Sequence, residues 1–285
     1  MVAACFSALF HSCTRKSGQE EGQLLIATSL FPVQSIVANL SGSQAESFFA
    51  VPVNANPHAY EPSPSLVRRL KKAKLFISIH PELDGWMKKY LAPEAAVLDL
   101  SGLVDLSGFG DNPHFWVSPH RLKPCTDTIA KALCRLLPSR SQDFEMNRML
   151  FLARLDSLEQ RIHAVSRICS GAKFIQWHPA WDYFASDYGF DLFGTIEKGH
   201  GKEPSVKDIE SLIRQARGQD VRAVIVGMAM ENKAAFNIAL EIRAQLIRLD
   251  HIGDPGDPLR SGYIRMMDFN MDRLARSCGG REVRP

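Results

Sequence analysis

The stretch DFEMNRMLFLARLDSLEQRIHAVSRICS, residues 143–170, contains neither glycine nor proline, and its apolar residues recur at intervals of four and three. The residues on this apolar face are Phe151, Leu155, Leu158, Ile162, Val165 and Cys169. Such spacing predicts one continuous helix, about 40 Å long at 1.5 Å per residue. We interpret it as a rigid rod joining two lobes, since it lacks the composition of a flexible linker. A long helix inside a single domain is the alternative.

Short β-rich runs alternate with helical patterns on both sides of this rod. The expected strands are 24–29, 47–53, 75–79 and 96–100 before it, and 173–177, 191–196, 223–228 and 245–250 after it. The expected helices are 32–41, 64–73, 82–91 and 119–137, then 180–188, 205–218, 232–244 and 263–277. This alternation predicts an α/β fold of two lobes, each with a mainly parallel four-stranded sheet flanked by helices.

The domain organisation follows from this pattern. We expect a leader and tether over residues 1–23, an N-terminal lobe over 24–140, a linking helix over 141–170 and a C-terminal lobe over 171–285. The leader MVAACFSALFHSC resembles an export signal, with Cys13 as a candidate lipid-attachment site and 14–23 as a tether. It departs from a typical lipoprotein signal in two ways: it has no basic region, and Phe-His-Ser precedes Cys13 in place of small residues.

Composition narrows the class of protein. The chain has 285 residues, of which 45% are hydrophobic and 23% charged, as in an ordinary globular protein. A formal net charge of +3 gives no reason to expect nucleic acid as a partner. The six cysteines form no Cys-x-x-Cys pair. We expect Cys125, Cys134 and Cys169 to be small buried side chains and do not expect a disulfide framework.

Histidines beside proline are the main chemical signal. The tripeptide NPH occurs around His58 and again around His114, and His178 precedes a proline in QWHPAW. In parallel α/β sheets, ligands bind at the carboxyl ends of strands. His58 and His178 follow predicted strands there, Asp250 ends another, and His114 lies in a loop before a helix. Any one of these histidines alone could be structural, but the shared setting predicts a common site in the cleft between the lobes.

Three imidazoles and one carboxylate make a four-ligand set for Zn²⁺ or a neighbouring divalent metal. Proline beside each histidine limits the conformational freedom that is lost on binding. Five aromatic residues could shield the ion: Tyr60, Phe115, Trp116, Trp177 and Trp181. We expect His80 and His120 to be helix caps or surface groups and His200 to be exposed, whereas His251 is an alternative to Asp250.

Several motifs together resemble the zinc- and manganese-type solute-binding proteins of bacterial ABC importers. The motifs, in family order over residues 24–278, are PHAYEPSPS, PELDGWMKKYL, NPHFWVSP, HPAWDYFASDYGF, GKEPSVKDIESLI and LDHIGDPGD with GYIRMMDFNMDRL. The resemblance implies two α/β lobes joined by one long helix, with a metal held between them. It also places the metal ligands at His58, His114, His178 and Asp250.

The departures from the family bear on the cargo. The loop LSGLVDLSGFGD before His114 has no histidine, so an auxiliary metal-collecting role is unsupported. GMAMENK stands where many members have a Glu-containing stretch, with Met228 or Met230 near that place. PELDGW favours zinc, whereas the Asp250 carboxylate would suit manganese.

The resulting expectation is a periplasmic, monomeric binding protein, not an enzyme, which delivers zinc to a membrane permease and is lipid-anchored through Cys13. Manganese or iron is the alternative cargo. A zinc-dependent hydrolase is a remote alternative, because no HExxH motif is present. A metal-binding surface adhesin is another, although no repeat or aromatic patch suggests an adhesive face.

Overall fold

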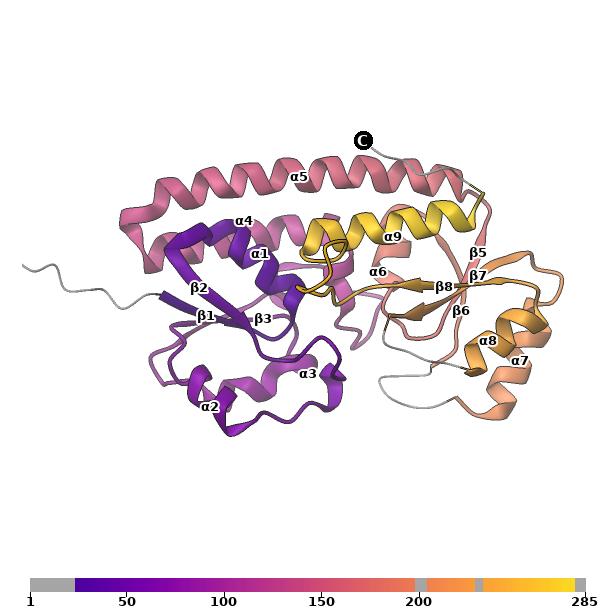
Figure 1. Ribbon diagram of the computed structural model, residues 1–285, viewed down its shortest axis with the longest axis horizontal. Coiled ribbons are helices and arrows are strands. Elements are labelled where there is room, and N and C mark those ends of the chain that lie inside the picture. Colours follow the sequence, from indigo (N-terminus) through magenta and orange to yellow (C-terminus); the bar gives the residue numbers. More distant parts are fainter. Residues whose placement is uncertain (1–23, 198–203, 229–232, 280–285) are drawn as a thin grey trace, which may run out of the picture.

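Two four-stranded sheets form the framework of the computed structural model, which describes residues 24–197, 204–228 and 233–279 (Figure 1). All strand pairings within them are parallel, in the orders β2-β1-β3-β4 and β6-β5-β7-β8. The strands of the first sheet are β1 (Leu24–Thr28), β2 (Ala45–Phe49), β3 (Leu75–Ser78) and β4 (Ala96–Asp99). Those of the second are β5 (Lys173–Gln176), β6 (Asp191–Thr195), β7 (Val221–Gly227) and β8 (Gln245–Leu249). The predicted fold class is confirmed.

Helices flank both sheets. In the first half they are α1 (Phe31–Ser41), α2 (Pro64–Leu70), α3 (Pro81–Asp84) and α4 (Pro119–Leu136). In the second half they are α6 (Asp182–Tyr188), α7 (Val206–Ala216), α8 (Lys233–Glu241) and α9 (Tyr263–Ser277). Pro64, Pro81 and Pro119 each stand at the first helical position, where proline's missing N–H has no cost. Among the described residues, none of the helices has the length and apolar character needed to cross a bilayer.

Two elements differ most from the sequence expectation, and several others differ by a few residues at their ends. The predicted strand 47–53 is β2, which ends at Phe49. Although the N–H groups of Ala50 and Val51 still donate to the carbonyls of Thr28 and Ser29 at the end of β1, Pro52 has no N–H with which to continue. The predicted helix 82–91 is the short α3 followed by a 3-10 turn, Gly85–Tyr90. Asp84 leaves helical geometry there, and its buried carboxylate accepts hydrogen bonds from Ser29 and Ser78.

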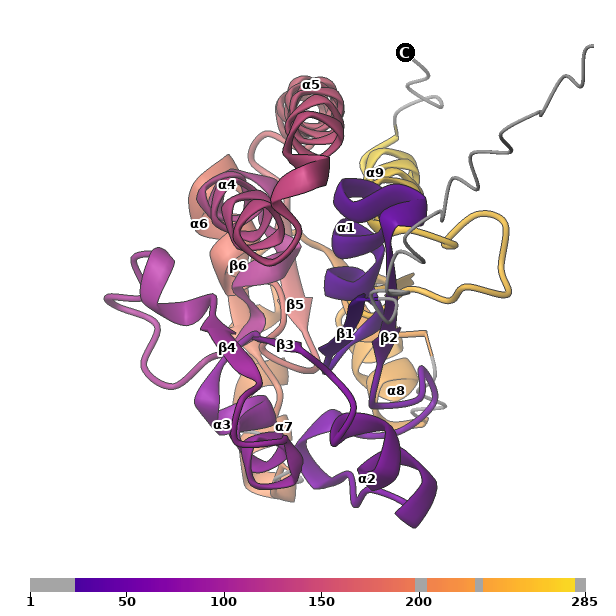
Figure 2. The same ribbon diagram turned by 90° about the vertical axis from the view of Figure 1, so that its left-hand side faces the viewer.

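The long helix predicted between the halves is α5 (Ser141–Ile168), of 28 residues. It runs past both sheets along one edge of the molecule (Figure 1). Its predicted apolar face is buried from Phe151 to Val165, and Phe144 extends it. α5 packs against α1 and α4 of the first half and α9 of the second. Figure 2, viewed along α5, shows these helices gathered at one end of the molecule.

The core does not stop at the boundary between the lobes. One cluster of buried apolar side chains includes Ile26 of β1, Leu155 of α5 and Ile225 of β7, together with Met267 of α9. At the start of α9, the Tyr263 N–H donates to Ser35 Oγ of α1 at 3.0 Å. Two smaller clusters lie beneath α2 in the first lobe and beneath α7 and α8 in the second. The lobes therefore have separate sheets but share their largest core.

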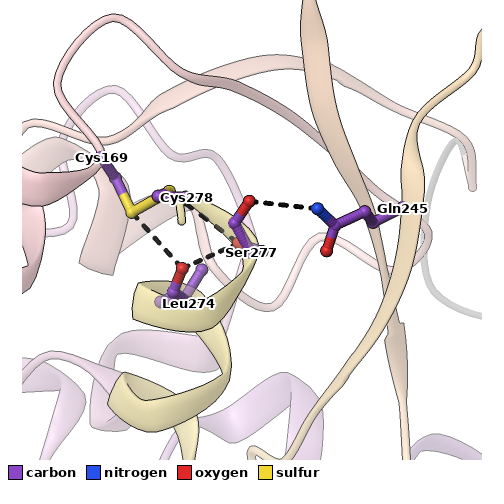
Figure 3. The surroundings of a disulfide bond; sticks show 5 residues. All are labelled: Cys169, Gln245, Leu274, Ser277 and Cys278. Atoms are coloured by element: carbon purple, nitrogen blue, oxygen red, sulfur yellow. Dashed lines mark hydrogen bonds between the residues drawn. A yellow bond between two sulfur atoms is a disulfide. The ribbon is translucent and has the colours of Figure 1, made fainter. Parts of the chain in front are cut away.

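A disulfide joins Cys169, just after α5, to Cys278, just after α9 (Figure 3). The two Cα atoms lie 5.3 Å apart and the residues are 109 positions apart in the chain. The expectation that Cys169 is only a small buried side chain is therefore wrong. Cys125 and Cys134 are free. Disulfides persist in oxidising compartments outside the cytosol, so this bond agrees with export.

Candidate metal site

A cavity of about 570 Å³ opens between the carboxyl ends of the two sheets. It is lined from the first half by His58, His114 and Trp116, and from the second half by His178 and Asp250. All four residues proposed from sequence thus face one cavity. Trp177 and Trp181 also line it. Tyr60 instead lies against Trp86, and Phe115 is fully buried in the core.

His58 lies in a 3-10 turn, Pro57–Ala59, in the loop between β2 and α2. The side chain of Asn56 accepts a hydrogen bond from the His58 N–H at 3.0 Å. This turn, begun by Pro57, fixes the backbone that carries the imidazole.

His114 is 1% exposed and begins the 3-10 turn His114–Val117. The side-chain oxygen Oδ1 of Asn112 accepts from the His114 N–H at 3.0 Å and lies 2.7 Å from its Nδ1. The amide nitrogen of Asn112 donates to Pro179 O at 2.8 Å and to Asp182 Oδ2 at 2.9 Å. Because Asn112 can only accept from His114, the Nδ1 atom carries the proton and Nε2 presents its lone pair to the cavity.

His178 is the second residue after β5, and its Nδ1 lies 3.0 Å from Oε2 of Glu197, the second residue after β6. An ionised carboxylate can only accept, so Nδ1 donates to it and Nε2 is again left for a ligand. Partners of this kind orient metal-binding histidines and raise their basicity. Burial raises the pKa of the neighbouring Asp182, which is hydrogen-bonded to Asn112 and Gln176.

The three imidazoles converge. One nitrogen from each of His58, His114 and His178 lies within 4.8 Å of the others. The Nε2 atoms of His114 and His178 are 3.0 Å apart. With zinc–nitrogen bonds of about 2.0–2.1 Å, tetrahedral ligands lie about 3.3 Å from one another. A small outward adjustment of the rings would therefore admit an ion, and the donor set suits zinc.

Asp250 lines the same cavity directly after β8, but its carboxylate is not part of this three-histidine cluster. Oδ1 accepts from the N–H groups of Ile252 and Gly253, both at 2.9 Å. Oδ2 accepts from Nη1 of Arg260 at 2.6 Å. The fourth-ligand role of Asp250 thus stays a prediction, and an ion bound there would compete with Arg260 for Oδ2.

His251, the alternative to Asp250, lies close to the cluster, with its ring centroid 5.7 Å from that of His114 and 5.8 Å from that of His178. Burial, followed by the nearby His178, lowers the pKa of His251 to about 4. The side chain is therefore neutral at ordinary pH. His80 accepts from the Glu82 N–H and caps α3, as predicted, and the side chain of His120 is exposed.

Three residues around the site were not anticipated from sequence: Asn112, Glu197 and Arg260. Glu197 could have been found, because it follows a strand at the same carboxyl edge as His178 and Asp250. Asn112 lies in the NPH motif itself. Of the two methionines considered, Met228 lines the cavity, whereas Met230, like His200 and Cys13, lies outside the described residues.

The family model of the zinc-uptake complex component A, described as periplasmic, matches residues 26–277. The chain belongs to this family. The resemblance found in the sequence motifs is thereby confirmed. Proteins of this zinc-uptake family are substrate-binding components of ABC transporters and not enzymes, so the hydrolase alternative falls away.

Individual relatives support the same placement. The high-affinity zinc uptake system protein ZnuA of Bacillus subtilis is 23% identical, over 97% of this chain and 96% of its own. A putative metal-binding protein of Chlamydia muridarum is 27% identical, over 72% of this chain and 76% of its own.

Solved structures of the zinc-uptake family and its neighbours share the fold. A crystal structure of ZnuA has a TM-score of 0.76 and 26% identity, covering 88% of this chain and 98% of its own. The binding protein FpvC of Pseudomonas aeruginosa, in complex with Mn²⁺, has a TM-score of 0.80 and 25% identity, covering 90% of this chain and 98% of its own.

Proposed function

We propose that this protein captures Zn²⁺ in the periplasm through His58, His114 and His178 and delivers it to an ABC-type import permease. The observation that carries the proposal is the convergence of three imidazole nitrogens within 4.8 Å, contributed by both halves of the chain. Family membership supports the transport role. The ion is cargo, bound and released unchanged.

Zinc is the proposed cargo because the preorganised donors are three neutral nitrogens, which suit this borderline metal. Two of the rings are already fixed with Nε2 toward the cavity by Asn112 and Glu197. We keep Asp250 as the proposed fourth ligand. Its Oδ2 would then bind the ion in competition with Arg260. Manganese is the second candidate, favoured by that carboxylate and by the likeness to FpvC, which was solved with Mn²⁺.

Loading is expected to involve limited closure of the lobes. The helix α5 spans both halves, and the largest apolar core is common to them. A wide hinge would have to break this packing, whereas small tilts and loop movements would not. A large metal-dependent change in solution scattering would contradict this part of the proposal.

We further propose that the protein acts as a monomer held near the membrane by a lipid on Cys13. The support is the sequence of the leader and the periplasmic location of the family. Mass spectrometry of the mature protein from membranes tests the anchor, since an unmodified or absent Cys13 would contradict it.

The primary test is elemental analysis of the purified protein, followed by zinc titration of wild type and His178→Ala against a fluorescent chelator. We expect one equivalent of zinc in wild type, and at least a 100-fold loss of affinity in the variant, because removing a ligand exceeds the 10–100-fold loss typical of its supporting partners. His120→Ala is the matched control, because that side chain is 70% exposed. Absence of zinc binding, or equal binding by His178→Ala, would refute the proposed site.

A further inference from the structure

Arg260 is held against the metal cavity by an unusual number of acidic neighbours. Its Nη1 donates to Asp250 Oδ2 at 2.6 Å, its Nε donates to Asp257 Oδ2 at 2.8 Å, and its Nη2 lies 3.7 Å from Asp254 Oδ2. The guanidinium also lies 5.7 Å from the ring centroid of Phe269 on α9. Its side chain is only 13% exposed, so these contacts fix its position instead of leaving it in solvent.

The loop that carries Arg260 is closed on itself. The Asp254 N–H donates to the Arg260 carbonyl at 3.1 Å, and the Arg260 N–H donates to the Asp257 carbonyl at 2.9 Å. Gly253 has φ +77°, and a Cβ there would lie 2.9 Å from Phe31 Cδ1, so this position needs glycine. The loop therefore presents the guanidinium to Asp250 as a preformed partner.

Both carboxylate oxygens of Asp250 already accept hydrogen bonds in this arrangement. Oδ1 accepts from two backbone N–H groups and Oδ2 accepts from Arg260. With the side chain of Asp250 only 4% exposed, the charge-assisted contact is strong. An ion that binds the Asp250 carboxylate competes with Arg260 for Oδ2.

We propose that Arg260 is a specificity-determining residue, which competes with the bound ion for Asp250 and thereby favours zinc over manganese. This inference rests on the proposed function and deepens it. Zinc bound by the three imidazoles can take a water molecule in the fourth position for as long as Arg260 holds Asp250. Manganese depends more on oxygen ligands and so loses more when Arg260 occupies the carboxylate. Selectivity comes from a residue that does not touch the ion.

The test measures zinc and manganese affinities of Arg260→Gln by competition with a fluorescent chelator. We expect manganese affinity to rise about tenfold, within the range of coupling between neighbouring sites, with a smaller rise for zinc. In an Asp250→Asn background the same substitution is expected to leave the ratio of zinc affinity to manganese affinity unchanged, because the carboxylate for which Arg260 competes is then absent. The visible spectrum of bound Co²⁺ should change in Arg260→Gln and not in the pair of Asp250→Asn proteins.

Arg265→Gln is the matched control, because Arg265 also contacts this loop, through Pro258 O and Ser261 Oγ, without reaching Asp250. If Arg260→Gln does not fold, Arg260→Lys keeps the charge but lacks the planar fork and should give a smaller shift of the same sign. A wild-type ratio in these Arg260 variants, or an equal shift with Asp250→Asn, would overturn the inference while leaving the zinc site intact. Failure of wild type to bind zinc would overturn both proposals.

Discussion

The helical seam and the cleft differ in the kind of side chain that they bring together from the two halves of the protein. The seam, which we define as α1, α4, α5 and α9, joins the two halves through buried apolar side chains, and a disulfide ties the end of α5 to the end of α9. The cleft brings polar side chains of the two halves together: His114 of the first half faces His178 of the second, and Asn112 donates to Asp182. Apolar packing stabilises the fold and does not depend on direction. The nitrogen and oxygen atoms of the cleft, by contrast, present lone pairs in fixed directions. Stability and metal affinity should therefore respond to different substitutions.

The largest stability effect is expected at the centre of the seam. Leu155 is fully buried on α5 within the core common to both sheets. Leu155→Ala should lower the free energy of unfolding by about 2–5 kcal/mol, from lost transfer energy and the cavity that remains. Chemical denaturation measures this loss, and zinc titration of the folded variant should match wild type. A large loss of zinc affinity in the folded protein would break the separation between seam and cleft.

The disulfide should have the next largest effect. Replacing Cys169 and Cys278 by alanine is expected to lower the free energy of unfolding by about 2–4 kcal/mol, because the bond closes a long loop in the unfolded chain. Urea denaturation of this variant and of wild type measures the difference, and a reducing agent should destabilise wild type alone. Cys134→Ala is the control, since this thiol is free and half-buried. An unchanged midpoint would show that the seam does not depend on the bond.

The smallest expected effect is on zinc affinity, which depends on the cleft and not on the seam. Glu197→Gln keeps the shape of the side chain but removes the charge that supports His178 Nδ1. Zinc affinity should fall about tenfold, at the lower end of the range for such partners, with little change in the unfolding midpoint. Glu94→Gln, at an exposed position, is the matched control. A wild-type zinc affinity in Glu197→Gln would mean that the carboxylate does not support the ligand.

Most of the fold could be predicted because parallel α/β elements leave local patterns. The interval of four and three from Phe151 to Cys169 predicted α5, and β-rich runs predicted all eight strands with small errors at their ends. The rule that ligands gather at the carboxyl ends of parallel strands then selected His58, His178 and Asp250 for one cavity.

What could not be predicted depends on contacts between distant residues. Cys169 and Cys278 carry no local sign of pairing, since their approach follows from the way α9 lies along α5. Likewise, the Arg260 contact with Asp250 depends on a closed loop whose turns set the direction of one side chain. The position of Asp250 could be predicted from the sequence, but the hydrogen bonds that its oxygens accept could not.

The common core also has a consequence for how the protein comes apart. Ile26 of one sheet and Ile225 of the other belong to the same buried cluster, so neither sheet can lose its packing without disturbing the other. In terms of cooperativity, we expect the two lobes to unfold as a single unit. Because both halves supply histidines to the proposed metal site, unfolding of either half would remove that site, and the common core should disfavour such half-folded molecules.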